Sequence, residues 1–224
     1  DPDFTPEPFT PFYLRSAYQS MRTLADRTLI LLRDRVKALP EEARAEAEKI
    51  LALKNEILTR FRLVIDQETT AMRIRGHGDY HLGQVLFTAK DFVITDFEGE
   101  PAQPLSERRR KRSPLRDVAG MLRSFDYAAL SALKSGDFRL EDMPRLKLFA
   151  QGWIFWVSVV FLQSYLEASR GGGFLPTAKD EMKTLLDLHL LYKAVYELSY
   201  ELNNRPDWVG VPIRGILDIL QADR

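Results

Sequence analysis

The sequence predicts a mainly α-helical fold with one small β-hairpin. Apolar residues recur at helical spacing over several long stretches, which prolines or a run of three glycines separate. Only one pair of short apolar segments has the length and the intervening turn of a hairpin. The chain has 224 residues, of which 45% are hydrophobic, enough to build a substantial core.

The first part of the chain predicts an extended connector followed by two helices. Residues 1–11 contain four prolines, which exclude a helix there. Helical spacing then covers about 12–38 and 40–65, and Pro40 separates the two stretches. We expect these helices to pack as an antiparallel hairpin.

The remaining elements are expected in a simple order. A short strand at 70–74 comes first, and segments 85–87 and 92–94 then flank a four-residue turn. Helical patterns follow at 114–134, 144–169 and 177–203, with a last helix after Pro212.

Composition excludes several classes of function. Basic and acidic residues both number 32, so no net charge directs the chain to nucleic acid. The chain has no cysteine, which excludes disulfides and cysteine-based zinc sites. The apolar run 153–162 is about half the length of a membrane helix. We therefore expect this run to be a buried core helix of a cytoplasmic protein without a membrane partner.

One stretch carries an arrangement suited to phosphoryl transfer. Gly76–Gln84 reads H-G-D-x-x-x-x-Q within it, and D-F-E follows at Asp96. Protein kinases have H-R-D-x-x-x-x-N and then D-F-G, with the same order and spacing. Such a site needs one carboxylate for the attacking hydroxyl and oxygen ligands for the metal. The pattern thus predicts a kinase-type site that uses ATP and Mg²⁺.

Each residue of this stretch receives an expected role. Asp79 is the catalytic residue that orients or deprotonates the hydroxyl. Gln84 and Asp96 bind the metal and, through it, the nucleotide phosphates. Glu98 is either a further metal ligand or a surface acid.

The two histidines of the loop have separate expected roles. His77 braces the catalytic loop as part of the catalytic set, and His81 faces the substrate. Their spacing of four would form a zinc pair on a helix, but Gly76 and Gly78 argue against a helix there.

A second polar cluster is expected on the last long helix. Carboxylates, an amide and one ring share a helical face, which suits the binding of a sugar; the residues are Glu197, Tyr200, Glu201 and Asn204. A solvated helix end is the alternative. The basic run 108–112 is interpreted as a solvated charge run, a phosphate-contacting loop or, least readily, a nucleic-acid contact.

Several of these motifs together resemble bacterial maltokinases, within the aminoglycoside-phosphotransferase-like branch of the kinase fold. The resemblance rests on four stretches: Gly76–Gln84, Asp96–Pro101, Ser113–Phe125 and Asn203–Trp208. It implies phosphorylation of maltose by ATP with Mg²⁺, giving maltose 1-phosphate for α-glucan synthesis. It also implies that the catalytic loop and the C-terminal helices hold the sugar, with Arg123 as a further contact.

The chain departs from that family before the catalytic loop. A kinase has an N-terminal lobe whose lysine and glutamate serve the nucleotide phosphates, and helical patterns stand here instead. We therefore expect 12–224 to be a kinase C-terminal lobe, with the catalytic hairpin at about 70–100 and the N-terminal lobe absent. The resemblance adds a fused trehalose synthase as a partner, and we expect the isolated chain to turn over ATP poorly.

Three alternatives remain open from the sequence. The acceptor could be another sugar such as glucosamine. The lobe could be a non-catalytic module of a fused glucan enzyme. A metal hydrolase built on His77, Asp79 and His81 is the third.

Overall fold

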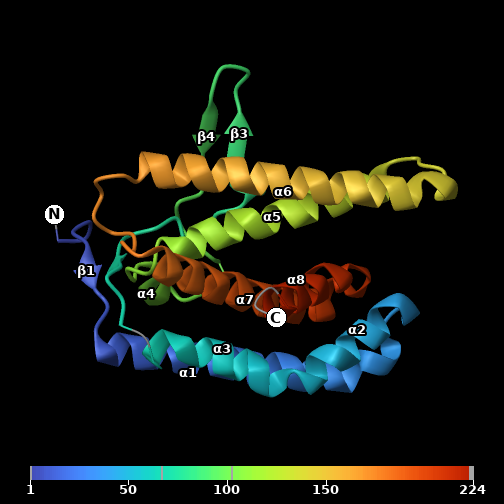
Figure 1. The fold of residues 1–224 in the computed structure, drawn as a ribbon, viewed down its shortest axis with the longest axis horizontal. Helices are drawn as coiled ribbons and strands as arrows, with labels where there is room; N and C mark the ends of the chain where they lie inside the picture. Colours follow the sequence, from blue (N-terminus) through green and yellow to red (C-terminus); the bar gives the residue numbers. More distant parts are fainter. Residues whose placement is uncertain (1, 67, 102, 222–224) are drawn as a thin grey trace. The chain divides into compact units, whose positions relative to one another are not determined.

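The computed structural model describes residues 2–66, 68–101 and 103–221. The chain forms two compact units. The first comprises Asp1–Glu7 and Met72–Leu175, and the second comprises Pro8–Ala71 and Pro176–Arg224. Each unit is described by itself, with the element labels of Figure 1.

The second unit is a bundle of helices. Its elements are α1 (Pro11–Arg35), η1 (Val36–Ala38), α2 (Glu41–Ala52), α3 (Lys54–Asp66), α7 (Lys179–Asn204), η4 (Pro206–Trp208) and α8 (Gly210–Gln221). Helix α1 begins at Pro11, one residue before the predicted start, and Thr10 caps it by accepting a hydrogen bond of 3.2 Å from the Tyr13 N–H. Pro11 then occupies the first turn, where no N–H is needed.

The expected pair of N-terminal helices is confirmed with one change. Helix α1 packs against α3, and the helix predicted over 40–65 is divided into α2 and α3. The division falls at Leu53, whose N–H is shared between the carbonyls of Lys49 and Ile50. Fully buried side chains from every long helix of this unit form its core, among them Leu32, Ile50, Ile57, Phe61, Leu191, Leu198, Ile213 and Ile216.

The first unit carries the loop motif of interest. Its elements are β2 (Met72–Arg73), η2 (Leu82–Gln84), β3 (Val85–Phe87), β4 (Phe92–Ile94), α4 (Leu105–Arg108), α5 (Leu115–Ser135), η3 (Leu140–Asp142) and α6 (Met143–Ala168). The short β1 (Glu7–Pro8) pairs with β2. Arg73 and Lys111 both bind the Glu7 carboxylate, at 2.8 and 2.7 Å.

The predicted β-hairpin is confirmed residue by residue. Val85 pairs with Ile94 and Phe87 with Phe92, in antiparallel register. The turn closes through the Thr88 N–H and the Asp91 carbonyl at 2.9 Å, with Ala89 in the left-handed region at φ 66°. The hairpin projects from its unit, and its strand side chains are largely exposed (Figure 1).

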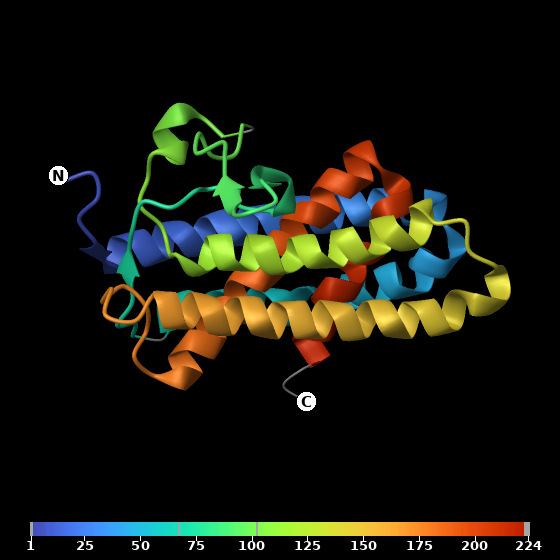
Figure 2. The ribbon, with the colours of Figure 1, turned by 90° about the horizontal axis from the view of Figure 1, so that it is seen from above.

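Helices α5 and α6 lie side by side in both ribbon views (Figures 1 and 2). Phe125 of α5 contacts the rings of Trp153 and Phe161 of α6 edge to face, with centroids 6.1 and 5.8 Å apart. These contacts occupy one side of α6.

The prediction that 153–162 is a buried core helix is wrong. None of the residues of α6 is buried, and Trp156 is 65% exposed. The reason is that apolar residues surround α6 on all sides while α5 covers only one. Within the described residues, Leu140–Ala168 is also the one helix whose length and composition would suffice to cross a membrane.

Candidate functional site

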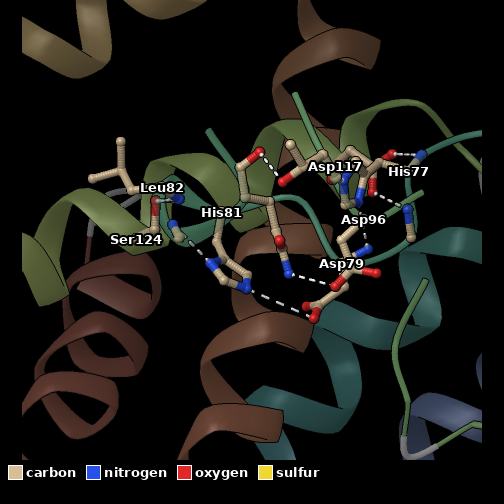
Figure 3. Close-up of polar contacts among 11 residues, drawn as sticks. His77, Asp79, His81, Leu82, Asp96, Asp117 and Ser124 are labelled. Carbon is tan, nitrogen blue, oxygen red and sulfur yellow. Dashed lines mark hydrogen bonds and ion pairs between the residues drawn. The ribbon is translucent and has the colours of Figure 1, made fainter. Parts of the chain in front are cut away.

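Helix α5 holds the loop Gly76–Gln84 in place through hydrogen bonds. Asp117, in the first turn of α5, accepts hydrogen bonds from the backbone N–H groups of His77 at 2.7 Å and Gly78 at 3.0 Å (Figure 3). Burial raises the pKa of the Asp117 carboxyl above its usual range, although these two hydrogen bonds and the nearby Arg116 charge oppose the shift. Asp117 therefore fixes the loop backbone immediately before Asp79.

Two further positions on the same face of α5 support the loop. A Cβ at Gly120 would lie 2.6 Å from the Tyr80 carbonyl oxygen, so only glycine allows this close approach. One turn later, the Ser124 hydroxyl accepts a hydrogen bond of 3.2 Å from the Leu82 N–H. Asp117, Gly120 and Ser124 thus hold successive parts of the loop.

The sequence motifs did not indicate a role for these three residues. Their spacing of three and four places them on one helical face. That face carries one acid, one glycine and one serine, while Val118, Ala119 and Met121 are buried beside them. A stripe of small and polar residues at helical spacing, beside buried apolar residues, was the available signal.

His77 braces the loop, as the sequence suggested. It is buried, and its Nε2 lies 2.7 Å from the Thr95 carbonyl oxygen, next to β4. The Asp79 N–H points to its Nδ1 at 3.4 Å, so Nε2 carries the proton and donates to Thr95. Since both ring nitrogens contact backbone, His77 is placed as a positioning residue.

Asp79 and His81 face each other across the loop. The Asp79 carboxylate lies 3.7 Å from the Nε2 of His81, with its side chain 17% exposed (Figure 3). The His81 Nδ1 accepts a hydrogen bond of 3.0 Å from the Gly83 N–H, which leaves the proton of the neutral ring on Nε2, toward Asp79. The two side chains form a polar pair that can hold a hydroxyl group.

Gln84 and Asp96 meet although they are 12 residues apart. The Gln84 amide nitrogen donates to the Asp96 carboxylate at 2.9 Å. Asp96 is held at φ 60°, in the left-handed region that non-glycine residues rarely adopt. In Figure 3 Asp96 lies beside Asp79, with His81 on the other side of Asp79.

The donor set fits a hard cation in part. Mg²⁺ binds proteins through one or two carboxylates together with substrate phosphates, and Asp96 and Gln84 offer oxygens of that kind. Glu98 does not join them, because its side chain is 84% exposed and lies 3.9 Å from Arg108. No group of three or more metal-binding side chains occurs in the part of the chain that the structure describes.

The geometry does not favour the zinc alternative. No helix runs through His77 and His81, and the ring nitrogens face the groups described above. The four-residue spacing of His77 and His81 therefore does not place the two rings on one helical face, as a zinc pair of this kind requires.

Arg123 is buried, whereas a residue that contacts a sugar would be open to the ligand. Its side chain is 5% exposed, and it forms an ion pair of 2.5 Å with Asp126 on the same helix. Its expected role in sugar binding stays a prediction.

The polar cluster of α7 belongs to the second unit and is divided between inside and outside. Glu197 and Glu201 are buried, whereas Tyr200 is 47% exposed and Asn204 is also exposed. Arg205 binds the Glu201 carboxylate through two hydrogen bonds of 2.9 and 2.6 Å. The same guanidinium lies over the rings of Tyr200 and Trp208. The expected single polar face is thus not uniform.

Comparison with known proteins identifies glucosamine kinases as similar. No family model matches the chain. It is 30% identical over 145 residues to a glucosamine kinase of Streptacidiphilus jiangxiensis, covering 64% of this chain and 31% of that protein. It is 40% identical over 142 residues to one of Mycolicibacterium smegmatis (strain ATCC 700084 / mc(2)155), covering 62% and 32%. The chain therefore corresponds to about a third of these relatives' length.

Solved structures agree on the fold. A glucosamine kinase in crystal form B superposes with a TM-score of 0.76 at 23% identity, over 98% of this chain and 48% of that one. Another, in complex with glucosamine, ADP and inorganic phosphate, gives 0.74 at 24%, over 98% and 50%. These likenesses confirm the predicted fold class, mainly α with a small β-hairpin in a kinase-like fold.

The same comparisons bear on the expected acceptor. The relatives described above are glucosamine kinases, which was the alternative to maltose that the sequence left open. They give no support to maltose itself or to a fused trehalose synthase. The chain is similar in sequence and fold to part of a glucosamine kinase.

Proposed function

We propose that this chain carries the acceptor-side catalytic residues of an ATP-dependent sugar kinase, with glucosamine as the preferred acceptor. The observation that carries the proposal is the meeting of Gln84 with Asp96 beside Asp79, on a loop that α5 holds in place. Similarity to glucosamine kinases supports the choice of acceptor.

In the proposed reaction, a sugar hydroxyl attacks the γ-phosphorus of ATP. The bond from that phosphorus to the β–γ bridging oxygen breaks, ADP leaves, and the hydroxyl proton passes to Asp79. His81, hydrogen-bonded through its Nδ1, directs its Nε2 proton toward Asp79 and helps to hold that carboxylate. His77 and Asp117 keep the loop backbone fixed while this happens.

Asp96 and Gln84 are the residues that would hold Mg²⁺. When bound, the ion neutralises charge on the β- and γ-phosphates. The hydrogen bond from the Gln84 amide nitrogen to Asp96 fixes the amide plane. Turning the Gln84 amide about its last bond would exchange its nitrogen for its oxygen and direct that oxygen at an ion held by Asp96.

The proposed acceptor is supported by similarity to glucosamine kinases and not by a described sugar contact. The α7 residues Glu197, Tyr200, Glu201 and Asn204, together with Arg123, remain our candidates for sugar binding. Maltose is retained as a second acceptor because of the motif resemblance given above. We place the reaction in the cytoplasm, where ATP is available.

The test is a comparison of acceptors with the full natural polypeptide. ADP release is followed with Mg-ATP and glucosamine, maltose or glucose, each at the same concentration. We expect glucosamine to give the highest kcat/KM. A higher value with maltose would keep the chemistry and change the substrate. No sugar-dependent ADP release with any of them would instead favour the non-catalytic module.

A further inference from the structure

A small pocket lies behind the catalytic loop and is rich in arginine. Its volume is about 30 Å³. Four arginines line it, together with the backbone of three glycines: Arg108, Arg110, Arg112, Arg116, Gly76, Gly78 and Gly99. Asp79, Gln84 and Asp96 are not among the lining residues, so the pocket is separate from the candidate phosphoryl-transfer site.

Two of the four arginines are hydrogen-bonded to one shared carboxylate. Arg110 and Arg112 each donate to one oxygen of the Glu107 carboxylate, both at 2.8 Å. The carboxylate of Asp117, also on the lining, is engaged with the loop backbone. These pairs form the walls of the pocket.

Arg108 has no comparably close contact with a carboxylate among the described residues. Its side chain is only 22% exposed, and its Nε is shielded from solvent without a hydrogen-bond partner among the described residues. Its Nη1 has only weak contacts with Glu98, at 3.5 Å to the carbonyl and 3.9 Å to the carboxylate. A buried guanidinium N–H without an acceptor is costly, and such a group in a folded protein calls for a bound water or ion.

Arg116 adds a second positive charge to the lining. It lies near Asp117, whose oxygens already accept two backbone hydrogen bonds. Three carboxylates, Glu100, Glu107 and Asp117, line the pocket with the four arginines, so the lining carries an excess of one positive charge.

We propose that this pocket binds a small tetrahedral oxyanion such as inorganic phosphate. Arg108 donates through Nε, and Arg116 supplies a second charged donor. A volume of this size holds roughly two water molecules, which suits a small ion. Gly76 and Gly78 line the pocket and flank His77 in the sequence. The bound anion therefore stabilises the backbone of the catalytic loop.

The experiment measures phosphate binding to the full natural polypeptide by calorimetry and by thermal unfolding. Sodium chloride holds the ionic strength constant, since salt alone screens exposed charges. We expect about 10 mM phosphate or sulfate to raise the Tm, and acetate to have little effect, because only the native state binds the tetrahedral ion. No rise above the chloride control would overturn the proposal.

Variants identify the site. Arg108→Lys keeps the charge and removes the Nε donor, and Arg116→Gln removes the second charge. Each is expected to weaken phosphate binding roughly tenfold or more. Arg109→Gln is the matched control, because Arg109 belongs to the same basic run, is exposed and does not line the pocket.

The pattern across these variants decides the outcome. Wild-type affinity in Arg108→Lys and Arg116→Gln, or equal weakening in Arg109→Gln, would show that phosphate binds elsewhere or only through general charge. Circular dichroism checks that each variant is folded. If Arg108→Lys does not fold, the Arg116→Gln and Arg109→Gln pair carries the test. The result is independent of the proposed kinase activity, because it measures binding of phosphate and not turnover.

Discussion

Asp117 accepts a hydrogen bond of 2.7 Å from the backbone N–H of His77, 40 residues earlier in the chain. A second bond from Gly78 uses its other carboxylate oxygen. This contact joins the start of α5 to the loop that carries Asp79. The position of the candidate catalytic carboxylate therefore depends on a helix that contributes no reacting group.

Asp117→Ala is expected to lower stability and activity together. It leaves two backbone N–H groups without their acceptor, at a cost of about 1–3 kcal/mol each if they stay buried. Urea denaturation measures the loss, and ADP release measures the fall in kcat. Asp137→Asn, at an exposed position, is the control and should change neither. Unchanged stability in Asp117→Ala would show that the loop is held by other contacts.

Two glycine-to-alanine changes in neighbouring helices should have opposite effects. In Gly120→Ala the new Cβ meets the Tyr80 carbonyl oxygen at 2.6 Å, so the loop must shift and the melting temperature should fall. In Gly152→Ala on α6 nothing lies within 4 Å of the new Cβ. Alanine there should stabilise by up to about 1 kcal/mol through helix propensity. Equal effects of the two changes would contradict the close approach of α5 and the loop.

Glu181 gives a prediction for pH. Burial would raise the pKa of its carboxyl, but hydrogen bonds from the Thr69 and Thr70 hydroxyls and from the backbone outweigh burial and lower that pKa. The folded state therefore releases the proton more readily than the unfolded chain. The stabilisation is present above the unfolded value of 4.5 and is lost as pH falls through the lowered pKa.

Glu181→Gln should remove this part of the pH dependence. Unfolding free energies measured from neutral pH down to about pH 3 should converge for wild type and variant at the acid end. A constant difference over the whole range would mean that the charge of Glu181 does not contribute. Lys179 is not a partner in these contacts, and Lys179→Gln is a suitable nearby control.

Local patterns were sufficient to predict much of the fold. The register of 85–87 with 92–94 follows from two apolar runs and a four-residue turn. The approach of Gln84 to Asp96 also followed, because a hairpin returns the chain to its starting point. These features depend on residues close in sequence.

Features that depend on distant neighbours were not predictable. The exposure of Trp156 depends on which helices cover α6, and its apolar composition does not reveal this. The burial of Glu201 likewise depends on packing within the second unit and on its pairing with Arg205. The role of Asp117 is not predictable from the sequence, because its partners are backbone groups and leave no side-chain pattern.

The most direct test of the account is Asp79→Asn in the full natural polypeptide, assayed for glucosamine-dependent ADP release with Mg-ATP. The amide cannot accept the hydroxyl proton, so we expect kcat to fall by about 10²–10⁴-fold. The unfolding transition should stay near that of wild type, and Asp137→Asn should retain full activity. A folded Asp79→Asn protein that phosphorylates glucosamine at the wild-type rate would contradict the assignment of Asp79 as the catalytic residue.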